Sequence, residues 1–265
     1  MITAGYFASI LIGISLGLIG GGGSILTVPV LVYLFGIDAL LATSYSLFIV
    51  GATSVAGAVS YFRKGLVSLK TAVVFGVPSI ASVFFTRTYL LPAIPQQVGS
   101  IGSFSVTRSM LLLLLFAILM LLAAYHMIKK GKSNATDPLP AQPFNYPLVL
   151  LQGVVTGTIT GLVGAGGGFL IIPALVNFLK MPMKIAVGTS LLIIAVNSLM
   201  GFLFSLGHTA VQWSLLLSIA AIAIAGILLG SYMAGKIDGK KLKPAFGWLV
   251  LLMGLFIIVK ETILK

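Results

Sequence analysis

The sequence predicts an all-α multi-pass membrane protein made of two inverted-topology repeats. The composition, the apolar runs and an internal duplication each support this prediction. Of the 265 residues, 59% are hydrophobic and only 8% are charged, whereas a soluble domain carries about 25% charged residues. A soluble fold of this length cannot bury so much apolar surface, so we expect a lipid bilayer to surround most of the chain.

Six uninterrupted apolar runs have the length of membrane-spanning helices. Each has about 20 residues, which cross about 30 Å of hydrocarbon at about 1.5 Å per residue. The longest polar segment carries several prolines and is typical of a linker. The predicted spans are residues 40–62, 67–91, 107–128, 184–207, 211–233 and 244–263. We therefore expect a first membrane repeat over 1–128, a cytoplasmic linker over 129–146 and a second membrane repeat over 147–265.

Two further apolar stretches, residues 5–36 and 148–180, are interrupted by glycines and match each other. When Pro29 is placed on Pro173, a shift of 144 residues, the register continues without a gap. Apolar composition alone aligns leucine with leucine, but it does not align this many glycines and serines, so we infer an internal duplication. The matched pairs include Gly13/Gly157, Gly17/Gly161, Gly20/Gly164, Gly22/Gly166, Gly23/Gly167, Ser46/Ser190 and Ser54/Ser198.

The distribution of basic residues indicates how the two repeats are oriented in the membrane. If the two interrupted stretches each cross the membrane once, eight Lys and Arg residues lie on one side and eight on the other, so no orientation is indicated. If each stretch crosses an even number of times, twelve lie on one side and four on the other, which satisfies the positive-inside rule. The connection Arg63–Lys70 is basic and its partner Gly207–Ser214 is not, as inverted repeats require. Both termini are then predicted to lie outside the cell's inner (plasma) membrane.

Each half is thus predicted to contain three full spans and one even-crossing element. In the first half, the pieces 5–19 and 25–36 would reach only about 22 and 18 Å as helices, short of about 30 Å of hydrocarbon. A re-entrant helical hairpin with its glycine tip near mid-membrane fits this length best. Two short tilted spans have the same parity, so that alternative stays open.

The glycine tips are the strongest candidate binding elements. Glycine costs a helix interior about 1 kcal/mol relative to alanine, so these runs should break the helix, and the freed backbone groups cannot face lipid. A helix that resumes at Ser24 or Phe169 would direct its free N–H groups at a polar cavity and form an anion site. Close helix packing is the alternative role, which we prefer for glycines at four-residue spacing such as Gly13 and Gly17. The candidate residues are Gly20, Gly21, Gly22, Gly23 and Ser24, and Gly164, Ala165, Gly166, Gly167 and Gly168.

Polar side chains in the span after each tip could complete the hydrogen bonds of an oxyanion. Ser46 and Ser190 are equivalent in the duplication, as are Thr53 and Asn197. The alternative for each is an ordinary hydrogen bond between helices or to the carbonyls of its own helix. We include all four among the candidate substrate-binding residues.

The remaining residues exclude several functions. Because the chain has no cysteine, thiolate catalysis and Cys-ligated metals are excluded, and no metal or cofactor is expected. The acids Asp38, Asp137, Asp238 and Glu261 are predicted at or outside the membrane boundaries, which disfavours an acid-based proton relay. The basic excess indicates topogenic charge and not nucleic-acid binding. Arg87 could draw anions into an outer vestibule or anchor the end of a span, and the sequence leaves both open.

The pattern G-x-G-G-(S/G)-x4-P followed by A-x-(S/G)-x-S-L occurs twice. It covers Gly20 to Pro29 with Ala42 to Leu47, and Gly164 to Pro173 with Ala186 to Leu191. This duplicated arrangement resembles the TauE/SafE sulfite exporter family, also called the toluene sulfonate uptake permease family, over nearly the whole chain. The resemblance implies secondary transport of sulfite, organosulfonates or thiosulfate, in either direction, with binding at the two tips. Ser24 stands where the second tip has Gly168, which points to an asymmetric site.

We therefore expect an anion transporter and not an enzyme, working by alternating access with the anion held near the midplane. Two alternatives are a passive anion channel and a membrane-embedded hydrolase that uses Ser24 with a histidine, either His126 or His208. The expected partners are a small inorganic or organic sulfur anion and the lipid bilayer, with no nucleic acid. Coupling to a proton or another ion and the oligomeric state stay open.

Overall fold

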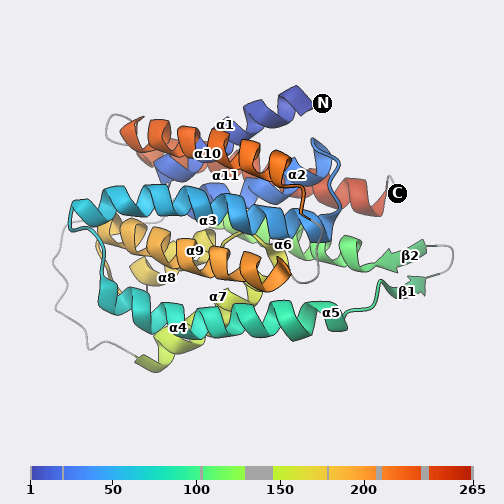
Figure 1. Cartoon of the computed structure of the whole chain (residues 1–265), viewed down its shortest axis with the longest axis horizontal. Coiled ribbons are helices and arrows are strands. Elements are labelled where there is room, and N and C mark those ends of the chain that lie inside the picture. Colours follow the sequence, from blue (N-terminus) through green and yellow to red (C-terminus); the bar gives the residue numbers. More distant parts are fainter. Residues whose placement is uncertain are drawn as a thin grey trace.

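Long helices that run along one axis make up most of the structure (Figure 1). Among the described residues, six helices are long and apolar enough to cross a membrane, judged by length and composition. Five of them match predicted spans, and the sixth, Tyr146–Val163, is the first arm of the second interrupted stretch. This confirms the predicted all-α multi-pass membrane fold. The computed structural model describes residues 2–19, 21–101, 104–128, 146–177, 179–206, 211–233 and 239–263. The predicted linker lies outside these ranges except for its last residue, as does Gly20 in the first tip.

A broken helical element opens the first half. Helix α1 (Ile2–Ile19) is followed by the 3-10 helix η1 (Gly21–Leu26) and the short helix α2 (Thr27–Tyr33). Two long helices follow, α3 (Ala39–Arg63) and α4 (Leu69–Phe85). A π-helical turn, η2 (Thr86–Leu90), continues α4 into α5 (Leu91–Ala93). The half ends with strands β1 (Gln97–Ile101) and β2 (Phe104–Thr107) and helix α6 (Arg108–Ile128).

The second half repeats this order of helices. Its broken element consists of α7 (Tyr146–Val163) and α8 (Gly168–Asn177), followed by α9 (Met183–Ser205), α10 (Trp213–Met233) and α11 (Gly239–Thr262). The 144-residue shift places α1 on α7 from the first residue to the last, and the start of α4 on the start of α10. The duplicated register therefore extends to the helix boundaries.

The two arms of each broken element differ in length. The first arms, α1 and α7, have 18 residues each, or about 27 Å as helices. The second arms are shorter, with 7 residues in α2 and 10 in α8. In the first half this corrects the expected pieces 5–19 and 25–36, because α1 already includes Ile2 and the 3-10 segment occupies the start of the second piece.

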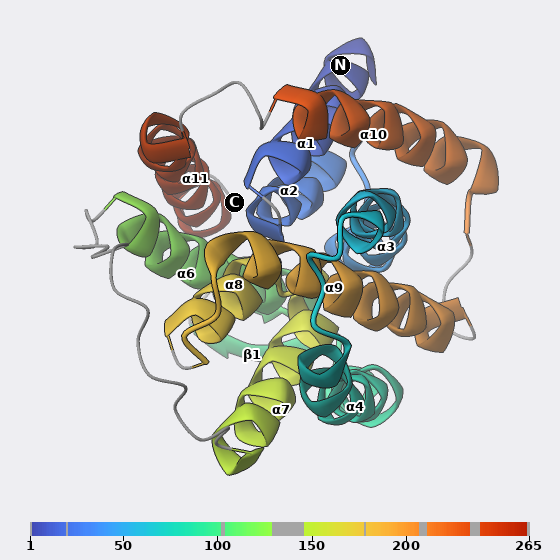
Figure 2. The same ribbon diagram turned by 90° about the vertical axis from the view of Figure 1, so that its left-hand side faces the viewer.

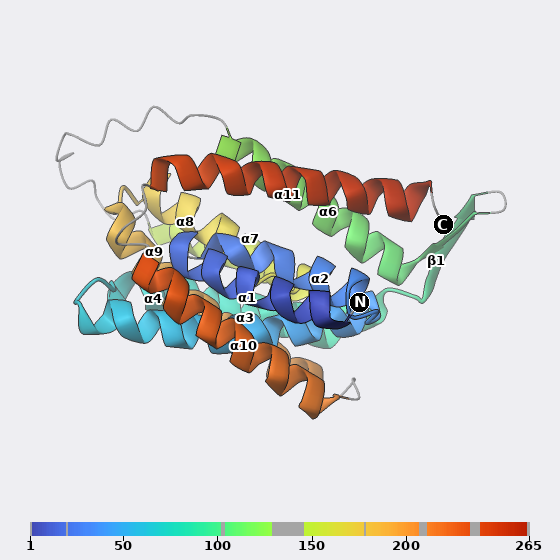
Figure 3. The same ribbon diagram turned by 90° about the horizontal axis from the view of Figure 1, so that it is seen from above.

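The strands β1 and β2 form an antiparallel hairpin that was not expected from the sequence. Ile101 pairs with Phe104 next to the turn, and Gln97 pairs with Thr107 at the open end. Figure 3 shows the hairpin projecting beyond the bundle, at the end where α1 begins and α11 finishes. The start of α1 and the end of α11 thus lie at the same end of the bundle.

Local signals explain where α3 begins and ends and where α4 begins. Asp38 caps α3, its Oδ1 accepting a hydrogen bond from the Leu40 N–H at 2.9 Å. Ser68 caps α4 by accepting from the Thr71 N–H at 3.4 Å. Gly65, at φ +66°, follows α3 and turns the chain, because glycine adopts positive φ without strain.

Helices α3 and α9 form the centre of the bundle. Viewed along the helices, Figure 2 shows α1, α2 and α10 on one side of them and α4 and α7 on the other, with α6 and α11 paired at the edge. About two thirds of the apolar window in α3 and in α9 is buried, against less than half in the other four candidate spans. The polar residues of α3 and α9 are therefore enclosed by protein.

Contacts between the halves recur with the same 144-residue shift. The N–H of Ser68 donates to Thr189 Oγ1 at 2.9 Å, and at the equivalent positions the N–H of Gln212 donates to Tyr45 Oη at 2.5 Å. Each half thus gives the other the contact that it receives. Reciprocal contacts of this kind are those of an interface with two-fold symmetry.

Close contacts between helix backbones also recur with the 144-residue shift. A Cβ on Gly13 would collide with the α10 backbone at Ala223, and a Cβ on Gly157 would collide with the α4 backbone at Ser79, the equivalent position. The expected close packing at these glycines is confirmed. In Figure 1 the equivalent helices α3 and α9 run in opposite directions. Inverted repeats require this arrangement, and their inversion across a bilayer stays a prediction.

Gly157→Ala should destabilise the protein by about 1–3 kcal/mol, because the added methyl group overpacks the α4–α7 contact. Gly76→Ala is the matched control, since nothing lies within 4 Å of a Cβ at this helical position. The control should be neutral or stabilise by up to about 1 kcal/mol. Thermal unfolding in detergent measures both variants, and equal stability of the two would contradict the assigned packing role.

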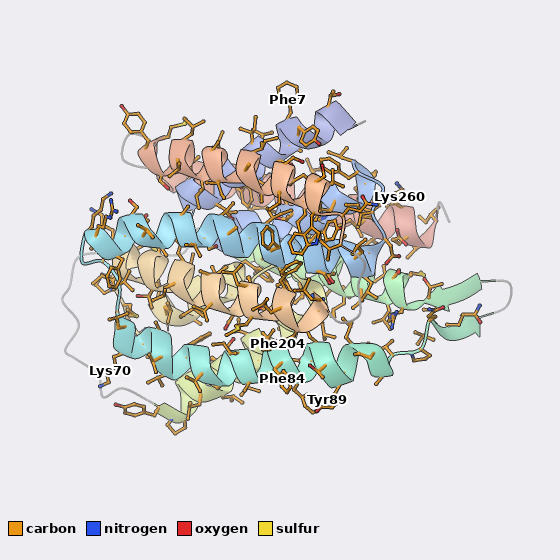
Figure 4. The ribbon with its side chains drawn as sticks, in the orientation of Figure 1. Phe7, Lys70, Phe84, Tyr89, Phe204 and Lys260 are labelled. Carbon is orange, nitrogen blue, oxygen red and sulfur yellow. The ribbon has the colours of Figure 1, made fainter. Side chains whose placement is uncertain are left out.

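Single cysteines can test the orientation cleanly, because the chain contains none. Lys64 and Val98 are both exposed and lie in the connections at opposite ends of the bundle, the ends near which Figure 4 places Lys70 and Lys260. In intact cells, an impermeant maleimide should label Val98→Cys, and it should label Lys64→Cys only after lysis. The opposite pattern would invert the predicted topology.

Candidate functional site

The second glycine tip is a buried, non-helical turn. Helix α7 ends at Val163 and α8 begins at Gly168. Between them, Gly164, Gly166 and Gly167 have φ of +74°, +67° and +69°, a region that residues with a side chain rarely adopt. All residues of this tip are buried. The predicted helix break is therefore present, although α8 resumes one residue earlier than expected.

The tip is held between α3, α7 and α9. A Cβ on Gly166 would lie 2.6 Å from Val50 Cγ1 of α3 and 3.0 Å from Ser198 Oγ of α9. Gly164 approaches the backbone of Thr43 in α3, and Gly167 approaches the Thr160 hydroxyl of α7. The absence of side chains thus lets these two glycines meet a backbone and a hydroxyl group directly.

Some of the amides freed by the break are already used within the turn. The Leu170 and Ile171 N–H groups both donate to Gly167 O, at 2.9 and 3.0 Å, and the Gly164 N–H donates to Thr160 O at 2.9 Å. An anion at this tip would therefore have to bind amides between Ala165 and Phe169. These include the first amides of α8, which have no partner inside that helix.

The first tip has a different backbone. Its described residues, Gly21 to Ser24, lie in the 3-10 helix η1, and the α-helix resumes at Thr27 and not at Ser24 as expected. Ser24 is fully buried within η1, and Gly23 lies against Ser15 and Leu16 of α1. Because η1 packs against α8, the structure brings the interrupted elements of the two halves side by side.

The four predicted polar residues are all fully buried, on α3 and α9. Thr53 donates to the Ile49 carbonyl at 2.7 Å and Ser190 to the Val187 carbonyl at 2.8 Å, so both bond to their own helix. Asn197 Nδ2 donates to Ser79 Oγ of α4 at 2.6 Å. Within the described residues, Asn197 Oδ1 and Ser46 Oγ have no hydrogen-bond partner.

Two further hydroxyl groups contact the second tip. Thr160 and Ser198 are fully buried, and neither hydroxyl has a hydrogen-bond partner among the residues described. A buried polar group without a partner costs about 1–3 kcal/mol, so both groups are suited to a ligand or a water. Ser198 could have been found from its equivalence with Ser54. Thr160 carries no such signal, because its position one helical turn before Gly164 is informative only once the break is located.

The charged residues singled out in the sequence differ in how far they are buried. Arg87 is only 3% exposed, so it does not anchor a span end at the membrane surface. Glu261 lies one residue before the end of α11, is 5% exposed and accepts a hydrogen bond from Tyr33 at 3.3 Å. It is therefore enclosed by protein, and its place at the membrane boundary stays a prediction. Asp38 is exposed as expected, and Asp137 and Asp238 lie outside the described residues.

Comparison with known proteins agrees with this architecture. The sequence matches the family described as "Sulfite exporter TauE/SafE" over residues 6–257. It is 31% identical over 255 residues to a "Probable membrane transporter protein" of Xylella fastidiosa (strain 9a5c), covering 94% of this chain and 91% of the relative. It is 26% identical over 265 residues to a protein of the same description in Methanocaldococcus jannaschii, covering 94% and 92% of the two chains.

A Bacillus subtilis (strain 168) protein, "Probable membrane transporter protein YunE", is 27% identical over 251 residues, which cover 89% of this chain and 90% of the relative. No solved structure matches the chain. The family match extends from α1 to α11 and includes both glycine tips. The chain therefore belongs to the sulfite exporter TauE/SafE family, whose relatives here are described as membrane transporters.

Proposed function

We propose that this protein is a secondary transporter that carries small sulfur-containing anions across the inner membrane by alternating access. The second glycine tip is the observation that carries the proposal, because it combines backbone amides and unpaired hydroxyl groups inside an apolar bundle. The family's description as a sulfite exporter supports the choice of anion. The description of the relatives as probable membrane transporters supports transport over catalysis.

The tip offers donors that suit an oxyanion. Sulfite and sulfonate groups present three oxygens that accept hydrogen bonds. The amides from Ala165 to Phe169 and the hydroxyls of Thr160 and Ser198 are donors in the second tip. The N-terminal end of α8 adds a favourable dipole for negative charge. In this proposal, η1 closes the site from the other half, because it packs against α8.

The two-fold contacts support alternating access as the mechanism. In inverted repeats, each half can adopt the conformation of the other, which moves the opening from one side of the membrane to the other around a central site. The broken elements meet at the central helices α3 and α9. A passive channel would need no such exchange. Saturable flux that depends on a counter-ion or a pH gradient would favour the carrier over the channel.

Gly166→Ala should reduce sulfite flux by about tenfold or more while the protein stays folded. The methyl group would crowd Val50, and a left-handed φ costs a residue with a side chain about 1–2 kcal/mol. Initial rates in proteoliposomes, with and without a pH gradient, measure the effect for sulfite, thiosulfate and methanesulfonate. Gly76→Ala provides the control, and wild-type flux in Gly166→Ala would refute a role for the tip.

Ser198→Ala should raise the half-saturating sulfite concentration by about tenfold, because it removes a hydroxyl that the ligand would bond. Ser190→Ala is a matched control on the same helix. Both serines are fully buried, but Ser190 bonds the carbonyl of its own helix. Concentration dependence of uptake distinguishes the two variants. Equal effects of both substitutions would remove Ser198 from the site.

A further inference from the structure

Arg87 carries a buried charge that contacts no acidic side chain within the part of the chain that the structure describes. It lies in the π-helical turn η2 and is 3% exposed. Its Nη1 donates to Ser44 Oγ of α3 at 3.2 Å and to Ser205 Oγ of α9 at 3.4 Å. Within the described structure, Nε and Nη2 have no hydrogen-bond partner. Because a buried guanidinium is costly unless an anion compensates it, the arrangement is incomplete as it stands.

Arg87 also lines a cavity. Its volume is about 180 Å³, whereas one water needs about 15 Å³ of such space, so it has room for a small oxyanion. Arg108 also lines it and donates to the Ile94 carbonyl at 3.2 Å. The other walls are apolar or hydroxyl-bearing. The lining residues are Leu40, Ser44, Arg87, Leu91, Pro92, Arg108 and Ser205.

A residue next to the cavity packs against α7, the helix that leads into the second tip. Thr86, next to Arg87, packs against Gly161 of α7, where an added Cβ would lie 2.8 Å from Thr86 Cβ. Gly161 stands one helical turn before the break. The Thr86 hydroxyl is buried and has no partner among the described residues. Groups that lack partners thus continue from the cavity toward the tip.

The opposite end of the bundle does not repeat this arrangement. The 144-residue shift places Arg87 on Ser231, Ser44 on Gly188 and Ser205 on Tyr61. A Cβ on Gly188 would lie 3.0 Å from Tyr61 Cβ, so Tyr61 packs against the position equivalent to Ser44. The guanidinium of Arg87 therefore has no counterpart at the equivalent position, and it lies at the predicted outer end.

We propose that Arg87, with Ser44 and Ser205, forms a second binding site for a small oxyanion at this end of the bundle. A planar guanidinium donates two parallel hydrogen bonds to two oxygens of one anion, and Arg108 adds a second positive charge at the cavity. Leu40, Leu91 and Pro92 give an apolar wall, so a sulfonate with a small alkyl group fits as well as an inorganic oxyanion. The binding of an anion here is independent of the proposed function. A role of this site in capturing the anion for transport rests on that function.

Equilibrium binding to the purified protein tests the site, with radiolabelled sulfate and methanesulfonate as separate probes. Arg87→Gln should weaken binding of both by about tenfold or more, since it removes a charged donor. Arg87→Lys should restore part of the affinity, because it keeps the positive charge but cannot donate two parallel hydrogen bonds from a planar group. Arg63→Gln is the control, an exposed arginine at the other end of α3, and should bind as the wild type does.

A readout at Arg87 itself separates this site from the tips. Phenylglyoxal modifies arginine side chains, and mass spectrometry of the Arg87 peptide reports the extent. Sulfate should protect Arg87 about tenfold or more in the wild type and equally in Gly166→Ala, the variant expected to lose flux. Lack of protection, or wild-type affinity in Arg87→Gln, would overturn the proposal. Protection of Arg87 by sulfate, with no sulfite or sulfonate flux in the wild type, would retain this site and reject the proposed function.

Discussion

Backbone groups that cannot face lipid constrain the whole structure. An apolar chain in a membrane satisfies its amides by forming helices, and every interruption must be enclosed by protein. The second tip, with three glycines at positive φ, therefore lies between α3, α7 and α9. Enclosing the tip requires close helix contacts, which the glycines of α1, α7 and α10 allow. The same small residues that pack the bundle thus position the broken elements at its centre.

The reciprocal contacts between the halves show that one sequence pattern is used twice within the same bundle. Thr189 and Tyr45 occupy equivalent positions, and each accepts a hydrogen bond from the other half. The departures from this symmetry are equally informative. One tip is a 3-10 helix and the other a turn of left-handed glycines, and only one half carries a buried arginine at the position of Arg87. The helix packing is therefore symmetric, whereas the polar groups differ between the two ends of the bundle.

The sequence predicted features that depend on neighbouring residues or on the duplication. These include the long helices, the break at Gly164–Gly167 and the close contacts at Gly13 and Gly157. It did not predict the β1–β2 hairpin, whose short strands carry little periodic signal, or the 3-10 form of η1. Nor did it resolve Arg87, because its neighbours Ser44 and Ser205 come from helices distant in sequence. Spacing predicts which residues share a helix face but not which helices meet around them.

The central claim is that the glycine tips hold the transported anion, and a structure determined with a bound anion tests it most directly. Selenite is a suitable probe, since it has the shape of sulfite and selenium is identified by its anomalous scattering. We expect selenium within hydrogen-bonding reach of the amides between Ala165 and Phe169 and of Ser198 Oγ. At a concentration that saturates transport, selenium found elsewhere with the tips unoccupied would contradict it.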